Sequence, residues 1–466
     1  MIKKCVLICG ISCAFLLADN QTATVSPVLP SNLPFRIKIE IADFSLPIGV
    51  QTYASGISND KYVIIAGRLA GSHTFNLPFP PDGQNPFVFV IDPEKKSVSY
   101  RSLADPSSGL SQTQIDALST VAPQYYQSGQ TLYVCGGYGI DTASGQFNTK
   151  SSIASIDMEG LIHWVTHPSK KGKASKHIRF TSDPLLQIAG GYLTQTNPHL
   201  PTMLIFGINY TGTDFANVNG VYSMQIRRFN VVDNGHNFYV RPDVATSMQP
   251  FFRRRDLNIM PVMKKTKTTY EPALVALSGV FTTSPIEPNI WTVPIEISQT
   301  GDMFMPDPNA PSTFKQAMNN YECANVGLYS KKHNNMYLVL LGGLSYGFFD
   351  NTGTFQLDNF IGYINQVTTI QIDKHNNYQQ FIMPDQYPFI ASSVPGDFYR
   401  FGAGAKFFPA KNAPLFANKV VQLDELSRSK PTLIGYIIGG IQSPEQNLLM
   451  GTIASTYIFR VIYQPL

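Results

Sequence analysis

The sequence has few charged residues and few cysteines for its length. Asp, Glu, Lys and Arg make up 14% of the 466 residues, and only Cys135 and Cys323 lie beyond the first 13 residues. A framework of several disulfides is therefore excluded. The two late cysteines are interpreted as small buried apolar residues, and a single disulfide between them is left open. A formal net charge of +4 predicts no general attraction to nucleic acid.

Motifs of several enzyme classes are also missing. The sequence contains no HExxH zinc-protease motif and no Walker phosphate-binding loop. Its eight histidines are scattered and show no spacing that suits metal ligands. We therefore expect no metal site and no cofactor.

No apolar run is long enough to cross a bilayer. Two lysines precede an apolar run from Cys5 to Ala18, which is typical of a secretory signal. We predict a signal peptide at residues 1–18, a leader rich in Pro, Ser and Thr at 19–33, and one folded domain at 34–466. The protein would then be exported, either periplasmic or secreted. A lipoprotein signal that places a lipid anchor at Cys13 is the alternative.

The chain is rich in glycine, proline and aromatic residues, with 35 Gly, 33 Pro, 30 Phe and 23 Tyr. This composition favours short strands and many turns. Six apolar runs end in a glycine, at intervals of 70, 70, 72, 64 and 97 residues, and the longest interval contains an insertion at Pro409–Pro431. The regular spacing indicates six copies of one unit. The glycines are Gly67, Gly137, Gly207, Gly279, Gly343 and Gly440.

Each unit has the same internal order. A first strand precedes the glycine-ended strand, and a variable loop, an alternating third strand, a tight polar turn and a fourth strand follow. Four antiparallel strands repeated six times bury both faces of each sheet only when the sheets pack around an axis. The sequence therefore predicts an all-β, six-bladed β-propeller. Short helices are predicted at Ser111–Thr120 and Ser312–Glu322 as connectors.

The two chain ends are predicted to pair. The last unit ends at a third strand near Tyr463, and a strand that begins at Phe35 belongs to no unit. Pairing of these two strands would complete the last blade, close the ring and remove two exposed edges.

The repeated pattern resembles kelch and galactose-oxidase-type propeller repeats over Phe35–Leu466, with Trp164 near the place of the kelch tryptophan in the fourth strand. The resemblance brings two enzyme activities into consideration. Copper chemistry needs two His, two Tyr and a nearby Cys, and we reject it because the histidines form no ligand pattern. Reclosure of acidic sugars, as in sialic-acid mutarotases, needs only an Arg and carboxylate constellation at the mouth of the ring.

Function in a propeller is expected on the face that carries the long loops. Arg179, Arg255 and Arg400 share a place just before the first strand of three units, and Arg68 begins a long loop. We interpret these four as ligand-binding residues whose guanidinium groups converge on a carboxylate or sulfate. The alternative is that they cap loop carbonyls and bridge neighbouring blades.

Tyr321 and Glu322 hold the corresponding place in the fifth unit and are the catalytic candidates if the protein is an enzyme. We expect a non-catalytic binding or interaction module for a glycan or a protein. One alternative is a carbohydrate-active enzyme of the epimerase or mutarotase type that acts on an acidic sugar. A structural envelope component is the second alternative.

Overall fold

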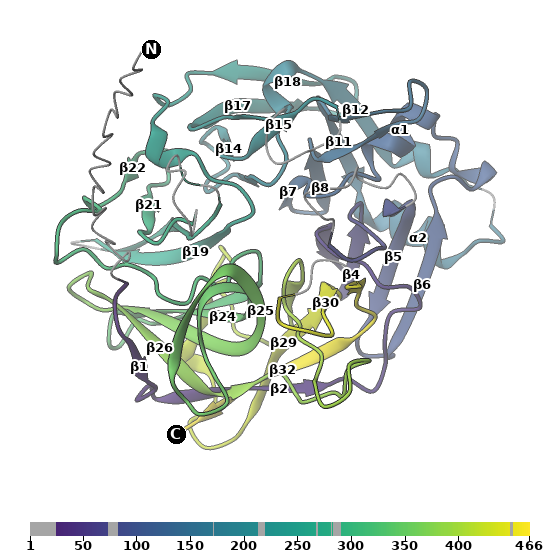
Figure 1. The fold of residues 1–466 in the computed structure, drawn as a ribbon. Helices are drawn as coiled ribbons and strands as arrows, with labels where there is room; N and C mark the ends of the chain where they lie inside the picture. Colours follow the sequence, from purple (N-terminus) through teal and green to yellow (C-terminus); the bar gives the residue numbers. More distant parts are fainter. Residues whose placement is uncertain are drawn as a thin grey trace, which may run out of the picture.

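The computed structural model shows an all-β propeller whose sheets are arranged around a common centre (Figure 1). It describes residues 25–72, 83–170, 172–212, 220–266, 269–280, 282, 290–447 and 451–466. The predicted signal peptide and the Cys13 alternative lie outside the described residues. Within these ranges, no helix is long and apolar enough to span a membrane.

Five sheets have four antiparallel strands each. Four of them follow the chain order that the repeat predicts, and the fifth takes its outer strand from the N-terminal part of the chain. They consist of β3 (Ala54–Ser58), β4 (Lys61–Ile65), β5 (Phe87–Asp92) and β6 (Ser97–Ser102); β7 (Gln124–Ser128), β8 (Thr131–Cys135), β11 (Ser152–Asp157) and β12 (Ile178–Ser182); β13 (Tyr192–Thr194), β14 (Thr202–Ile205), β17 (Ile226–Asp233) and β18 (Phe238–Asp243); β19 (Asn258–Lys265), β20 (Tyr270–Leu277), β21 (Ile295–Ile297) and β22 (Met303–Phe304); and β27 (Lys406–Pro409), β29 (Thr432–Ile438), β32 (Ile458–Pro465) and β2 (Phe35–Ile41).

The remaining large sheet has six strands, so the prediction of six like-built four-stranded blades is wrong. Four consecutive strands form its antiparallel centre, and one short strand pairs in parallel with each edge. The two extra strands come from the leader and from the insertion, which the repeat does not include. The order is β1 (Val28–Pro30), β26 (Tyr378–Gln386), β25 (Phe355–Ile372), β24 (Asn335–Phe349), β23 (Ala324–Ser330) and β28 (Val421–Gln422).

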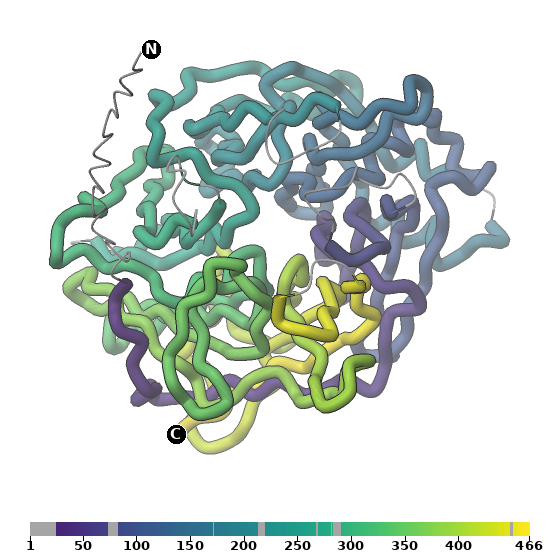
Figure 2. The backbone as a smooth tube through the Cα atoms, viewed as in Figure 1, coloured from purple at the N-terminus to yellow at the C-terminus, as the bar shows by residue number. Residues whose placement is uncertain are grey.

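The predicted pairing of the two chain ends is present. Strand β2 runs antiparallel to β32, and Ile37 stands opposite Tyr463. Figure 2 shows the purple segment that contains β2 beside the yellow C-terminal segment. Phe35, Ile37 and Ile39 alternate with exposed or half-buried residues and pack into the core, which explains why this strand is amphipathic.

A two-residue turn explains the six glycines: it follows the second strand in five of the large sheets and lies within β24 in the six-stranded sheet. Both residues of each pair have positive φ, and the second has φ between 78° and 104°. This backbone suits glycine, because a Cβ atom is strongly disfavoured there. The pairs are Ala66–Gly67, Gly136–Gly137, Phe206–Gly207, Ser278–Gly279, Gly342–Gly343 and Gly439–Gly440.

The connections divide between two faces. The second-to-third-strand loops and the connections between sheets form one face, called here the loop face, and the tight turns form the opposite turn face. Strands β24 and β25 extend beyond Gly343 into the loop face, and three loops carry small hairpins. These hairpins are β9 (Tyr138–Asp141) with β10 (Gln146–Thr149), β15 (Ile208–Tyr210) with β16 (Gly220–Tyr222), and β30 (Ile441–Gln442) with β31 (Ile453–Ala454).

The described chain contains two α-helices. Helix α1 (Gln112–Ala117) confirms one predicted helix, and Ser111 caps it in a capping box. No helix forms at Ser312–Glu322, so that prediction is wrong. Helix α2 (Met158–Thr166) was not predicted, and it places Trp164 in a helix rather than in a fourth strand.

The core lies between the faces of neighbouring sheets. Val63 and Val90 of one sheet, for example, belong to the same buried cluster as Val134 and Ile156 of the next. The insertion at Pro409–Pro431 lies across the turn face, where β28 pairs with β23 and Asn418 Nδ2 donates to Val262 O of β19 (3.1 Å). It therefore ties three neighbouring sheets together on the side away from the loop face.

Candidate functional site at the strand corners

The first strand of every large sheet is preceded by a sharp corner. Two residues before each of these strands, the chain passes through a residue with positive φ, which turns the backbone from the loop face into the sheet. We call these six the corner residues. They are Thr52 (φ 49°), Ala122 (50°), Gly190 (64°), Asp256 (49°), Glu322 (51°) and Gly404 (65°).

Backbone hydrogen bonds join the corner residues in succession. Because five of the six N–H groups donate to the carbonyl of a neighbouring corner residue, residues from six distant parts of the sequence are held side by side at the centre. The bonds run from Gly404 N to Glu322 O (2.7 Å), Thr52 N to Gly404 O (2.8 Å), Ala122 N to Thr52 O (3.2 Å), Gly190 N to Ala122 O (3.1 Å) and Asp256 N to Gly190 O (2.9 Å).

Two of the corner residues are acidic, and they affect each other. Burial raises the pKa of Glu322 to about 7, and repulsion from the Asp256 carboxylate acts in the same direction. The positive charges of Lys406, which begins β27, and of Arg255 oppose this rise. As a whole residue, Glu322 is half-buried. The site therefore contains a carboxyl group that changes its charge near neutral pH.

The contact of Thr52 favours the ionised form of Glu322. Thr52 Oγ1 donates to Glu322 Oε1 (3.1 Å) and also contacts Gln51 Oε1. Gln51 Nε2 donates to the carbonyls of Ala70 and Gly71, which holds Gln51 beside the site. A hydrogen bond donated to a carboxylate stabilises its charge, so Thr52 opposes the rise in the pKa of Glu322 that burial causes.

Arg255 and Asp256 form an ion pair beside Glu322. Arg255 Nε lies 3.3 Å from Asp256 Oδ2, and the Arg255 guanidinium stacks 5.1 Å from the Tyr210 ring centre. Burial lowers the pKa of Arg255, and Asp256 opposes that shift. The Asp256 side chain keeps 26% of its surface exposed, so the pair is open on one side. We call Thr52, Arg255, Asp256 and Glu322 the corner site.

The structure places the predicted residue Tyr321 at this site. Tyr321 pairs through its backbone with Leu344, and burial raises the pKa of its hydroxyl. The buried Tyr363, which sequence analysis missed, comes from the β24–β25 extension, and its hydroxyl contacts Ser72 Oγ. Burial raises the pKa of Tyr363 to about 12, and the charge of Glu322 acts in the same direction.

Two other predicted arginines lie near the corners but are engaged by the protein. Arg68 pairs through its backbone with Gln51, is buried, and donates from Nε to Gly71 O (3.1 Å). Arg400 pairs through its backbone with Ser443 and donates from Nη1 to Asp397 Oδ1 (2.9 Å). Both arginines hold loop segments, as the alternative in the sequence analysis expected.

The structure does not bring Arg179 together with the other arginines. It lies in β12, the last strand of its sheet, where it forms an ion pair with Asp233 of β17 and stacks 5.8 Å from the Phe238 ring centre. The expected convergence is thus wrong for Arg179, because helix α2 occupies the stretch after β11 and moves the fourth strand to Ile178–Ser182.

A serine pattern in the sequence is structural here. Residues Gly343–Gly347 read Gly-Leu-Ser-Tyr-Gly, which is the spacing of a nucleophile elbow. Ser345 is fully buried in β24, donates from Oγ to Gly347 O (2.6 Å) and accepts from Asn319 N (3.0 Å). Neither partner is a base, so this serine holds the strand extension rather than attacking a substrate.

Cys135 and Cys323 are both buried and unpaired, which resolves the disulfide question left open above, and burial raises the pKa of Cys323 to about 12. Among the described residues, no group of three or more His, Cys, Asp and Glu side chains could hold a metal ion.

A groove of about 660 Å³ lies away from the corners, between the β19–β22 sheet and the β25–β26 turn. Its polar groups largely satisfy one another: Glu296 accepts from Lys264 Nζ (2.9 Å) and from the Tyr378 hydroxyl (3.0 Å). The corner site is the better candidate, because the Asp256 side chain is partly exposed and burial raises the pKa of the neighbouring Glu322.

These features define the protein as a β-propeller with a polar site at its centre. No family model matches the sequence, and no curated protein matches it. Among solved structures, the chain is similar to one titled "Structure of YjhT", with 12% sequence identity, a TM-score of 0.47, and coverage of 90% of this chain and 98% of that chain. A likeness at this identity does not extend to activity.

Proposed function

We propose that the protein is a kelch-like propeller in which the β2–β32 pair closes the ring. Every large sheet has one two-residue glycine turn on its second strand and one corner residue before its first strand. This recurrence supports a single repeated unit. The chain of hydrogen bonds through all six corners supports one common axis. The ring would then be sealed where the two chain ends meet.

We further propose that the exported protein binds a glycan through the loop face, as a binding module, with the corner site at the centre. The observation that carries this proposal is the constellation of buried Arg255, partly exposed Asp256 and half-buried Glu322 beside the Thr52 hydroxyl. Sugar hydroxyls both donate and accept hydrogen bonds. The site matches them, because Asp256 accepts, Arg255 donates, and Glu322 does either according to its protonation.

The test is a glycan array followed by calorimetry on the purified mature protein. Asp256→Asn and Glu322→Gln should weaken binding of the selected glycan, whereas Glu94→Gln, on an exposed turn of the turn face, should not change it. A wild-type protein that binds no glycan would refute the binding function and favour a protein ligand or a structural envelope role. N-terminal sequencing of the exported protein tests the predicted cleavage after Ala18.

One observation favours the enzyme alternative. Glu322, with a pKa of about 7 beside ionised Asp256, forms an acid and base pair of the kind that opening and reclosing a sugar ring requires. Exchange of anomers of acidic sugars, followed by NMR, should then be accelerated by the wild type and not by Glu322→Gln. Absence of any acceleration by the wild type would remove this alternative.

A further inference from the structure

The connection from β26 to β27 carries a small hairpin on the loop face. Tyr399 N donates to Ile390 O (2.8 Å), Ser392 N donates to Asp397 O (3.0 Å), and Gly396 with φ 82° closes the turn. Phe389 precedes one arm of this hairpin and Phe398 lies in the other. The backbone bonds therefore fix the positions of both aromatic rings.

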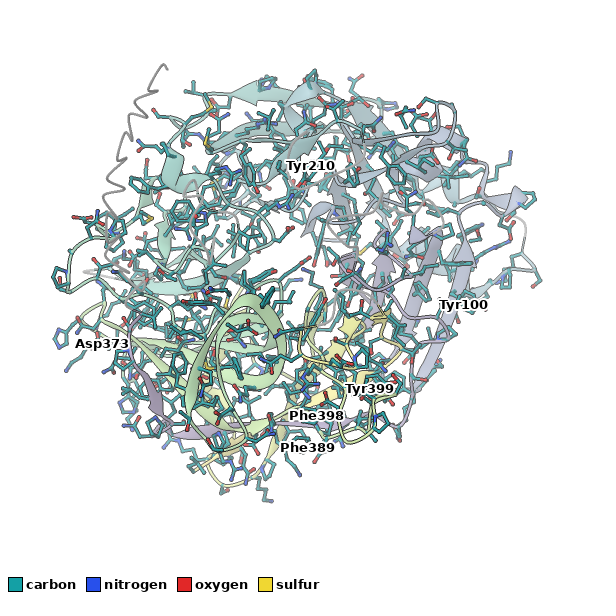
Figure 3. The ribbon with its side chains drawn as sticks, in the orientation of Figure 1. Tyr100, Tyr210, Asp373, Phe389, Phe398 and Tyr399 are labelled. Atoms are coloured by element: carbon teal, nitrogen blue, oxygen red, sulfur yellow. The ribbon has the colours of Figure 1, made fainter. Side chains whose placement is uncertain are left out.

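The two rings meet edge to face, and one arginine lies against the second ring. The Phe389 and Phe398 rings are 4.8 Å apart at 89°, and the Arg400 guanidinium lies 4.5 Å from the centre of Phe398. Arg400 Nη1 donates to Asp397 Oδ1 (2.9 Å) and to Phe398 O (2.8 Å), which holds the guanidinium in place. Figure 3 shows Phe389, Phe398 and Tyr399 close together. We call Phe389, Phe398, Asp397 and Arg400 the aromatic platform.

The platform offers an apolar ring to solvent next to polar groups. Phe389 keeps 67% of its surface exposed although its neighbours hold it in place. Within the described part of the chain, Arg400 Nε and Nη2 have no hydrogen-bond partner, and its charge is balanced by Asp397. An exposed, fixed aromatic ring loses little entropy when a ligand covers it, which favours a binding role.

The chemistry of the platform suits a neutral sugar unit. A sugar ring presents an apolar face of C–H groups for stacking, and hydroxyls at its edge for Arg400 and Asp397. A peptide side chain would instead need a concave pocket to bury it. The internal Arg400–Asp397 pair leaves no net charge to select an ionic ligand.

The platform is close to the corner site along the chain. Arg400 pairs with Ser443, and four residues later Gly404 is bonded to both Glu322 and Thr52. Four residues span at most about 14 Å. A short oligosaccharide can therefore reach from one to the other.

We infer that the aromatic platform is a second subsite for the same glycan, and that the ligand is an oligosaccharide extending from the corner site to the rim. This inference rests on the proposed glycan-binding function. It predicts that affinity rises with chain length until a sugar unit reaches Phe389 and is constant beyond that length.

The experiment measures calorimetric affinities of wild type, Phe389→Ala, Phe389→Tyr and Phe360→Ala for one homologous series, from the monosaccharide to the hexasaccharide of the glycan selected on the array. Phe360 lies in the β24–β25 extension and is 85% exposed, so its variant is the matched control. We expect Phe389→Ala to lose about tenfold in affinity for the longer chains only. Phe389→Tyr and Phe360→Ala should bind like the wild type.

The failures of the two proposals differ. If the wild type binds the series but Phe389→Ala matches it at every length, the platform is refuted and the central site stands. Length-independent affinity of the wild type would also refute the platform. If the wild type binds no glycan, the proposed function fails and the platform inference falls with it. Selection of a peptide that loses affinity with Phe389→Ala would assign the surface to a protein partner instead.

Discussion

Replacing Glu322 by glutamine should make the protein more stable at alkaline pH. The folded state raises the pKa of Glu322 from 4.5 to about 7, so it binds this proton more tightly than the unfolded chain does. Below pH 4.5 Glu322 is protonated in both the folded and the unfolded chain, so its ionisation does not change the free energy of unfolding. As the pH rises to 7, the unfolded chain ionises first. The free energy of unfolding then falls by about 3 kcal/mol, because each pH step of one between the two pKa values removes about 1.4 kcal/mol.

The Glu322→Gln variant has no such loss, because its amide does not ionise and its carbonyl oxygen can still accept from Thr52 Oγ1. It should equal the wild type near pH 4 and exceed it by about 3 kcal/mol near pH 8. Urea unfolding followed by tryptophan fluorescence measures this difference, with Glu94→Gln as the exposed control. A difference between variant and wild type that does not change with pH would refute the raised pKa of Glu322.

Other substitutions test the scaffold by the same unfolding assay. Ile37→Ala should cost about 2–5 kcal/mol because Ile37 is buried between the chain ends, whereas the exposed Lys38→Ala should cost less than about 0.5 kcal/mol; equal losses would contradict the strand pairing. Gly343→Ala should cost about 2 kcal/mol or more, since its Cβ would lie 2.7 Å from Cys323 Cβ, and it should exceed Gly129→Ala, which meets no atom within 4 Å. Arg254→Met should cost about 2 kcal/mol or more, because the fully buried guanidinium bonds three carbonyls that would lose their donors; a neutral result would show that these carbonyls find other partners.

The repeat could be predicted because the two-residue turn at the end of each second strand restricts the residue type. A φ near 90° at the end of each second strand selects glycine, so Gly67 and Gly440 mark equivalent places although they are far apart. The first member of each pair has φ between 44° and 68°, which Ala66 and Phe206 tolerate. The sequence therefore showed clearly how far apart the units are, whereas the first residue of each pair varied from unit to unit.

Helices and edge strands were harder to predict. The buried residues Met158, Leu161, Ile162 and Val165 follow a helical period, but they continue an alternating strand without a break. At Ser312–Glu322, the side chain of Gln380 accepts from the backbone of two residues, and this tertiary contact replaces the helix. Strands β1 and β28 pair with segments far away in the sequence, so no local sequence pattern predicts them.

The candidate site was found in part. Arg255 and Glu322 were identified because basic and acidic residues are rare in this chain and stood at equivalent places. Thr52 and Asp256 were missed, since a threonine or aspartate in a turn is common. The signal that would have found them is their position two residues before a first strand, once the six units are aligned.

The corner residues themselves give the strongest reason to look for function at the centre. Gly190 and Gly404 adopt the left-handed backbone at little cost, and so would glycine at the other corners. The chain instead has a β-branched Thr52 and a Glu322 there, with φ of 49° and 51°, and the acidic residue is also desolvated beside Asp256. Backbone strain of about 1 kcal/mol or more at each position adds to the ionisation cost worked out above. A fold that needed only a tight corner would be more stable with glycine at both places, so these side chains are best explained by a ligand that contacts them.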